Sequence, residues 1–319
     1  MRANFTFRRL EYFIAVGETG SVAGASGKLN VSPPSISAAL VQLEEELGVQ
    51  LFIRRRAHGM ALTSGGRRLF YEAKKVLRHA GNLQNIATDL YEQISGVLRV
   101  GCLQTVAPLI LPWLRKDFEA KFPRVRVCQT EDHHAGLLAA LQNADIDLAL
   151  TYDLNISANI HFEPLASLPP YAMFAPEHPL SARRTVTLAD LAPEPLILLD
   201  LPLSSTYFLS MFKLTGIVPR ITERSKDMAL VRSMVANGFG YSLGNVRPRP
   251  EIAPDGKRLK HVPLKNNLRP MRLGLAVCRT DNYTTRAAEA FCENCRNMIT
   301  TDTLQGMSTA NADGAEDDR

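Results

Sequence analysis

Apolar residues in the first fifty positions recur at the three- and four-residue spacing that is typical of amphipathic helices. One set predicts a helix that ends near residues 17–20: Leu10, Phe13, Ala15 and Val16. A second set predicts a helix that Gly48 ends: Ile36, Leu40, Leu43 and Leu47. Between them, residues 22–29 are rich in small side chains, which suits a short helix that another helix crosses closely. We therefore expect three short helices.

A tight turn separates the second of these helices from the third. Ser32 is a good N-cap residue, and Pro33 suits the first helical position. Two short helices joined by a turn, the second firmly capped, describe a helix-turn-helix whose second helix can lie in a DNA major groove. From the spacing alone, a generic three-helix bundle is an equal alternative.

Two short segments, LFIRRR (51–56) and MALT (60–63), flank residues 57–59 and predict a β-hairpin wing. Arg54, Arg55 and Arg56 lie in the first run, where they can neutralise phosphates or enter a minor groove. A solvated run of charges is the alternative interpretation. The helix-turn-helix immediately upstream favours DNA binding.

A long helix without proline is expected from its N-cap, Thr63, to about residue 93. Its apolar positions step by four and three residues along the whole length: Leu69, Ala73, Val76, Ala80, Leu83, Ala87 and Leu90. Such a seam must pack against another helix, and the simplest partner is the same helix of a second chain. That dimer would present two helix-turn-helix units to two DNA half-sites. Packing against the chain's own C-terminal part is the alternative.

Four segments, in this order and spacing, resemble the N-terminal signature of the LysR-type transcriptional regulators. They are LEYFIAV (10–16), VSPPSIS (31–37), LEEELGVQLF (43–52) and LTSGG (62–66). The resemblance is strong to about residue 95 and looser over 96–300. It implies a dimeric or tetrameric DNA-binding regulator that a small-molecule effector controls, with no cofactor and with RNA polymerase as a further candidate partner.

The third helix departs from the family's pattern. The family commonly has a polar residue, often Gln, where this chain has Pro33, and Arg where it has Ala38. Guanine readout by an arginine of this helix is therefore not expected. We expect the affinity for DNA to depend on the wing arginines together with Arg67 and Arg68. Sequence preference should then depend on DNA shape. The predicted DNA-binding residues are Ser32, Pro33, Pro34, Ser35, Ser37, Ala38, Gln42, Arg54, Arg55, Arg56 and Arg67.

From residue 96 onward, short apolar strands alternate with helices, which predicts a parallel sheet covered on both faces. The expected strands of this sheet are 96–102, 125–129 and 146–150, and its helices are 107–122 and 135–142. A second α/β unit is expected from about residue 169, with a strand at 196–199 and helices at 204–214 and 227–237. The chain then returns to the first unit at 271–277 and ends in a helix over 284–298.

The expected fold class is a multidomain α+β protein. We assign residues 1–63 to a winged helix-turn-helix domain, 64–95 to a linker and dimerisation helix, and 96–301 to an effector-binding domain. By the family resemblance, this last domain is two-lobed like a periplasmic solute-binding protein. Lobe 1 covers about 96–168 and 271–301, lobe 2 about 169–270, and residues 302–319 are expected to form a disordered tail.

The resemblance places the effector between the two lobes, where the carboxyl ends of sheet strands also favour ligand binding. Ser204, Ser205 and Thr206 combine hydroxyls with helix N-terminal amides, which suits a carboxylate or another anion; simple helix capping is the alternative. Tyr171 and Tyr207 are further aromatic candidates, although aromatic residues in an α/β core more often serve packing. The predicted effector-binding residues are Gln104, Thr105, His133, His134, Tyr152, Pro202, Ser204, Ser205 and Thr206.

Net charge adds a weak indication of a polyanionic partner. The chain carries 37 Lys and Arg against 32 Asp and Glu, a net charge of +5. Residues 1–95 carry 12 basic against 8 acidic side chains, whereas the tail is acidic. The positive charge is therefore densest, per residue, in the predicted DNA-binding part.

Several function classes lack the residues they need. The chain has no G-x-S-x-G, P-loop or H-E-x-x-H motif, so we expect no enzyme. His133 and His134 have no third ligand beside them, so no metal site is predicted. Cys292 and Cys295 lie in a predicted helix, and we interpret them as structural thiols. All five cysteines fall in lobe 1, whereas peroxide-sensing members of the family carry a cysteine pair in the second unit. This placement argues against peroxide sensing.

One further class remains as an alternative: a solute-binding or enzymatic α/β protein with an accessory helical domain. The arginine wing and the lack of a signal peptide disfavour solute binding outside the membrane. No apolar run reaches about 18 residues, so we expect no membrane span and a cytoplasmic location.

Overall fold

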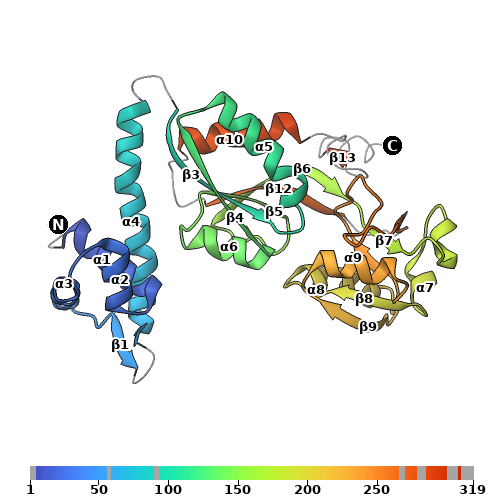
Figure 1. The fold of residues 1–319 in the computed structure, drawn as a ribbon, viewed down its shortest axis with the longest axis horizontal. Helices are drawn as coiled ribbons and strands as arrows, with labels where there is room; N and C mark the ends of the chain where they lie inside the picture. Colours follow the sequence, from blue (N-terminus) through green and yellow to red (C-terminus); the bar gives the residue numbers. More distant parts are fainter. Residues whose placement is uncertain are drawn as a thin grey trace. The chain divides into compact units, whose positions relative to one another are not determined.

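The computed structural model describes residues 5–55, 59–89, 94–265, 270–278, 285–299 and 308–309. The chain forms two compact units: an N-terminal unit of residues up to 93 together with 143–145, and a C-terminal unit of the remainder. Each unit is coloured along the sequence in Figure 1. Within the described ranges, no helix combines the length and the apolar character needed to cross a membrane.

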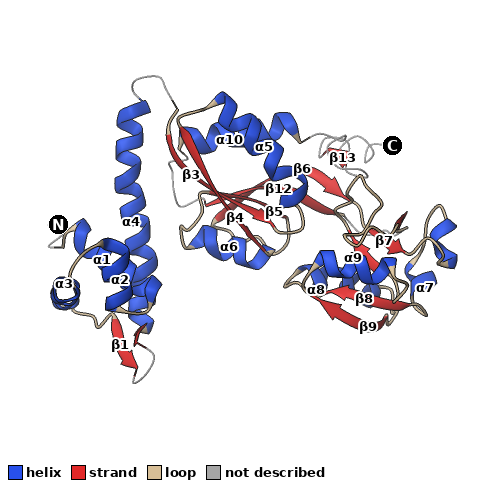
Figure 2. Ribbon diagram, viewed as in Figure 1, coloured by secondary structure: helices blue, strands red, loops and turns tan. Residues whose placement is uncertain are grey.

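The N-terminal unit is a winged helix-turn-helix followed by a long helix, as predicted (Figure 2). Its elements are α1 (Phe7–Thr19), α2 (Val22–Leu29), α3 (Pro33–Leu47), β1 (Phe52–Arg55), β2 (Gly59–Leu62) and α4 (Ser64–Asp89). The strands β1 and β2 pair antiparallel, with Phe52 opposite Leu62 and Arg55 opposite Gly59. Gly59 therefore belongs to the second strand, although the sequence placed it in the loop.

Local capping chemistry fixes the ends of these helices. The Ser32 hydroxyl accepts a hydrogen bond from the backbone N–H of Ser35, and Pro33 occupies the first turn of α3. Gly48 ends α3 with a positive φ of 65°, a conformation that glycine adopts without strain. At the start of α4, the Thr63 hydroxyl accepts from the Gly66 N–H at 2.8 Å. The caps predicted at Ser32, Gly48 and Thr63 are confirmed.

Three phenylalanines hold the wing and the long helix onto α1. The Phe13 ring meets the rings of Phe52 and Phe70 edge-on, with centroids 5.5 and 6.0 Å away. All three side chains are buried in the core of the N-terminal unit. Edge-to-face pairs of this kind add to the free energy gained from apolar burial, so the wing has a fixed place beside the helix-turn-helix.

The first lobe of the C-terminal unit is built on a six-stranded sheet with strand order β13-β6-β12-β5-β3-β4. Its strands are β3 (Gly96–Leu103), β4 (Val125–Asp132), β5 (Leu148–Tyr152), β6 (Ile160–Leu168), β12 (Met271–Cys278) and β13 (Ser308–Thr309). Figure 1 shows α5 (Ala107–Lys121) and α10 (Arg286–Met298) on one side of the sheet and α6 (His134–Gln142) on the other. Helices therefore cover both faces, as predicted.

The three strands predicted from the strand-helix alternation are parallel, but the strand where the chain returns to the sheet is not. Strands β3, β4 and β5 are parallel, but β12 runs antiparallel to both β5 and β6. The chain leaves this sheet through β6, which the sequence analysis missed, and re-enters it through β12 after the second lobe. Ser308 and Thr309, expected to be disordered, pair with β6; the rest of the predicted tail lies outside the described residues.

The second lobe lies between β6 and β12 in the sequence. It contains the antiparallel strands β10-β7-β11 and the parallel pair β8-β9. Their bounds are β7 (Tyr171–Phe174), β8 (Pro195–Leu199), β9 (Arg220–Ser225), β10 (Ser242–Gly244) and β11 (Lys260–Pro263). The helices are α7 (Leu188–Leu191), α8 (Ser204–Leu214) and α9 (Met228–Ala236), with a short 3-10 turn at Pro179–Ala182.

Candidate functional site

Helix α3 buries one face and exposes the other. Ile36, Leu40 and Leu43 pack into the core of the N-terminal unit. The predicted DNA-binding positions lie on the outer side: Ser32, Pro33, Pro34, Ser35, Ala38 and Gln42 are exposed, and Ser37 is half-buried. The helix therefore presents the face that the sequence analysis assigned to DNA.

Two of the hydroxyls on this face are already engaged. The oxygens of Ser32 and Ser35 lie 2.7 Å apart, and Ser32 also caps the helix. Helix α3 carries no lysine or arginine, so Ser37 and Gln42 are the side chains left on its outer face to hydrogen-bond a base edge.

The acidic end of α3 is tied to its own unit. Glu44 accepts hydrogen bonds from the backbone N–H groups of Leu51 and Phe52, at 2.7 and 3.2 Å, and so fixes the start of the wing against the helix. Glu46 forms an ion pair with Arg9. The ion pair with Arg9 reduces the repulsion that Glu46 would exert on a polyanion.

The N-terminal unit also carries exposed arginines outside this helix. Arg54 is exposed in β1, and Arg67 and Arg68 are exposed in the first turns of α4. The backbone of Arg55 lies in β1 opposite Gly59. The side chain of Arg55 and all of Arg56 lie outside what the structure describes.

The predicted seam of the long helix is used in part by its own unit. Ala73 is buried in the core that the helix-turn-helix forms, and Leu69 packs against the same core. Val76, in contrast, is 40% exposed. The side chains of Leu83 and Ala87, and Leu90 as a whole, lie outside the described residues. Among the seam side chains that the structure describes, Val76 is thus exposed and available to a second chain, whereas Ala73 is not.

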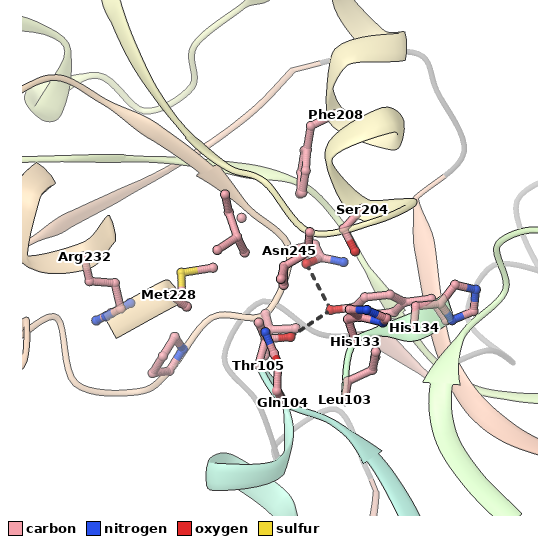
Figure 3. Close-up of a pocket in the computed structure, with 16 residues that line it drawn as sticks. Leu103, Gln104, Thr105, His133, His134, Ser204, Phe208, Met228, Arg232 and Asn245 are labelled. Atoms are coloured by element: carbon pink, nitrogen blue, oxygen red, sulfur yellow. Dashed lines mark hydrogen bonds between the residues drawn. The ribbon is translucent and has the colours of Figure 1, made fainter. Parts of the chain in front are cut away.

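A second candidate site is a cavity between the two lobes of the C-terminal unit (Figure 3). It is narrow: the positions open to the centre of a water molecule fill about 40 Å³, room for a few waters. The first lobe contributes Leu103, Gln104, Thr105, His133, His134 and Tyr152. The second lobe contributes Leu199, Leu201, Ser204, Phe208, Met228, Arg232, Gly244, Asn245, Val246 and Pro248.

Tyr152 lines this cavity and is buried. Its hydroxyl donates to Asn245 Oδ1 of the second lobe at 3.5 Å, and Thr105 Oγ1 of the first lobe lies 3.4 Å away. Both hydrogen bonds are long and therefore weak. Burial raises the pKa of Tyr152 to about 12, so the phenol stays neutral. Polar groups of both lobes thus converge on one hydroxyl.

His134 forms part of the cavity wall, but both of its ring nitrogens make hydrogen bonds within its own lobe. Nε2 lies 2.6 Å from the carbonyl oxygen of Leu154, which can only accept, so Nε2 carries the proton. Nδ1, 2.6 Å from the Thr151 hydroxyl, is then the acceptor. Burial lowers the pKa of His134 and keeps it neutral. His134 therefore shapes the cavity and orients Thr151.

Arg232 is a cavity residue that the sequence analysis missed. It is 7% exposed, and its guanidinium donates to the carbonyl oxygens of Ile252 at 3.0 Å and Pro250 at 3.4 Å. Burial lowers its pKa, and no carboxylate among the described residues pairs with it. A signal was present: Arg232 falls on the apolar face of α9 beside Val231 and Val235.

The residues at the start of α8 divide into two groups. Ser204 is buried and lines the cavity. Ser205 donates its hydroxyl to the Leu201 carbonyl at 3.0 Å, and no side chain caps the start of α8, so the capping alternative does not describe Ser205. Pro202 and Thr206 are exposed. Pro202, Ser205 and Thr206 are therefore predicted effector residues that this cavity does not bring together with the others.

The remaining aromatic and sulfur groups have structural surroundings. The Tyr171 hydroxyl donates to the Val246 carbonyl at 2.8 Å, and Tyr207 packs against the core. Burial raises the pKa of Cys292 to about 11 and also raises that of Cys295, so neither is a reactive thiolate at neutral pH. These surroundings support the interpretation of the pair as structural thiols.

Two family profiles match this chain. The profile of the bacterial regulatory helix-turn-helix protein, lysR family, matches residues 7–67, and that of the LysR substrate binding domain matches residues 92–299. The HTH-type transcriptional regulator BsdA of Bacillus subtilis is 30% identical over 90% of this chain and 98% of its own length. The DNA-binding transcriptional dual regulator OxyR of Escherichia coli is 30% identical over 79% of this chain and 81% of its own length.

Solved structures agree with these matches. HinK, a LysR family transcriptional regulator from Pseudomonas aeruginosa, has a TM-score of 0.61 and 36% identity, over 92% of this chain and 99% of its own. CbnR in complex with its target DNA has a TM-score of 0.63 at 23% identity, covering 92% of this chain and 99% of its own. The second likeness bears on the fold alone.

Proposed function

The chain belongs to the LysR family of DNA-binding transcriptional regulators with an effector-binding domain, and we propose that a small anion in the cavity between its lobes is the effector. The observation that carries this proposal is Arg232. A guanidinium that is buried without a carboxylate partner is costly, and a bound anion would offset that cost. The alternative of a solute-binding or enzymatic protein with an accessory helical domain is not favoured, because the relatives of this chain are transcriptional regulators.

Neutral hydrogen-bonding groups complete the proposed effector site. Thr105, Tyr152 and Asn245 make only long contacts with one another, so a ligand oxygen can replace them at little cost. Ser204 opens helix α8, whose N-terminal amides favour negative charge. Gln104 reaches across the cavity, with Nε2 3.5 Å from the Lys226 carbonyl. These groups would orient an anion that Arg232 attracts.

The size of the cavity suggests how the effector acts. The cavity is narrow, so the larger organic acids would separate the lobes on binding. The effector would then shift a pre-existing equilibrium between lobe arrangements. In the dimer or tetramer that we expect from the α4 seam, that shift would change the spacing of the half-sites or the bend of the DNA.

The DNA-binding part of the proposal places α3 in a major groove. Arg54, Arg55, Arg56 and Arg67 would neutralise phosphates, and Ser32, Pro33, Pro34, Ser35, Ser37, Ala38 and Gln42 would face the bases. Such a protein acts on chromosomal DNA in the cytoplasm, where RNA polymerase is a candidate partner.

A thermal-shift series with matched ligands tests the anion. Benzoate, acetate and succinate are compared with benzamide, acetamide and succinamide, which keep the shape and lose the charge. A carboxylate that binds the folded state raises the Tm by mass action, whereas its amide should not. Arg232→Gln should abolish the shift. The exposed Arg220, changed to Gln, is the matched control that should keep it.

The opposite pattern would reject the anion. Stabilisation by neutral or cationic compounds, with no response to carboxylates, would show that the cavity recognises another class. A carboxylate shift that survives Arg232→Gln would place the anion elsewhere. The Tm of each variant without ligand separates a loss of binding from a loss of folding.

A further inference from the structure

The outer face of α3 carries an apolar stripe. Pro34, Ala38 and Val41 are spaced by four and three residues, which places them on one side of the helix. All three are exposed, and the Val41 side chain is 53% exposed. A branched apolar side chain in the middle of this face has no partner in its own unit to cover it, among the residues that the structure describes.

Few polar side chains on this face are free to distinguish one base pair from another. The Ser32 and Ser35 hydroxyls bind each other, and Ser37 is half-buried. No residue of α3 before Glu44 is charged. Bidentate hydrogen bonding, the usual means of discriminating bases, is therefore confined to Gln42.

The charge around the stripe indicates what covers it. Arg54, Arg67 and Arg68 are exposed on the same unit and would be drawn to phosphates. In the major groove between those phosphates, the apolar group that the bases present is the C5 methyl of thymine. Charge and apolar surface together fit the edge of a thymine-containing duplex.

We propose that Ala38 and Val41 select thymine by packing against its C5 methyl groups, so that each half-site carries thymine where these side chains meet the groove. The proposal rests on the DNA-binding function and adds the chemical group that is recognised. Discrimination by methyl contact replaces the guanine readout that this helix lacks.

Uracil substitution isolates the methyl group, because 2′-deoxyuridine keeps every hydrogen bond of thymine. The operator is first located by footprinting the full-length protein on the DNA upstream of its own gene. Fluorescence anisotropy then compares that duplex with one whose half-site thymines are replaced by deoxyuridine. Each contacted methyl should account for about fourfold in Kd, the value expected from burying one such group.

Variants of Val41 assign the contact to a side chain. Val41→Ala should weaken binding to the thymine duplex and leave binding to the deoxyuridine duplex unchanged. Alanine is the better helix former, so a weakened α3 cannot explain that result. Val41→Thr keeps one methyl in place and should retain most of the thymine preference. Val97→Ala, at a valine 42% exposed on the C-terminal unit, is the control and should bind like wild type.

The two duplexes separate this inference from the proposed function. Salt-sensitive binding that is equally tight to both duplexes would overturn methyl recognition and leave the DNA-binding function standing. Equal losses on both duplexes for Val41→Ala would also overturn it, because Val41 would then act through the protein. The absence of any salt-sensitive footprint would instead defeat the DNA-binding function itself, and the inference with it.

Discussion

The Tyr152 hydroxyl of the first lobe donates a hydrogen bond at 3.5 Å to Asn245 Oδ1 of the second lobe, and both residues line the cavity. A contact of this length is weak enough for a ligand or a movement of the lobes to break. Asn245 also lies 3.3 Å from the Met271 sulfur, next to the point where the chain re-enters the first lobe. A polar residue of the cavity lining is therefore in contact with the connection between the lobes.

Tyr152→Phe should affect ligand binding more than folding. It removes two long hydrogen bonds, so the free energy of unfolding should fall by less than about 1 kcal/mol. The affinity for a stabilising carboxylate should fall about five- to tenfold, measured by titration calorimetry. The control is Tyr12→Phe, which removes a 2.7 Å hydrogen bond from Arg8 in the N-terminal unit and should leave the affinity for the carboxylate unchanged. Equal affinity in Tyr152→Phe and wild type would exclude this hydroxyl from effector binding.

Arg54→Gln should reveal a phosphate contact. The substitution should weaken binding to the operator and to an unrelated duplex by the same factor, because phosphates carry no sequence. The slope of log K against log salt should become shallower by about 0.9. Arg55→Gln is expected to behave alike. A loss confined to one operator base pair would show that the arginine reads a base.

Phe13→Ala should destabilise the N-terminal unit by about 3–5 kcal/mol, because it empties the position between Phe52 and Phe70. Scanning calorimetry should show a Tm lower by more than about 10 °C for this unit. Phe7, which is 55% exposed, is the matched control, and Phe7→Ala should change the Tm little. Similar effects of both substitutions would argue against the aromatic cluster as the element that holds the wing.

His261 should make stability depend on pH. Burial, with the nearby charges of Arg232 and Arg247, lowers its pKa from 6.5 to about 4. The unfolded chain therefore binds the proton more readily, and stability is fully present above pH 6.5. It falls by about 1.4 kcal/mol per pH unit as the pH drops from 6.5 toward 4.

Urea unfolding at several pH values measures this slope. His261→Phe should flatten it between pH 6.5 and 4, whereas substitution of the exposed His161 with Asn should leave it unchanged. A slope that His261→Phe does not alter would assign the pH dependence to other groups.

The sequence predicted features whose causes are local. Ser32 and Gly48 mark the ends of α3 because capping depends on a few adjacent residues. Gln104 and Tyr152 reached the cavity because both lie at the carboxyl ends of strands. The antiparallel course of β12 was missed because its pairing with β5 joins residues far apart in the sequence. Arg232 was missed because its burial depends on how α9 packs against the rest of the second lobe.

The central claim is that an anion in the cavity controls DNA binding, and a footprint measured with and without that anion tests it most directly. The full-length protein is footprinted on the DNA upstream of its gene, with and without the carboxylate that raises its Tm. We predict a salt-sensitive footprint whose length or affinity changes with the carboxylate in wild type and in Arg220→Gln, and does not change in Arg232→Gln. A footprint that is identical with and without the carboxylate in wild type would contradict the account.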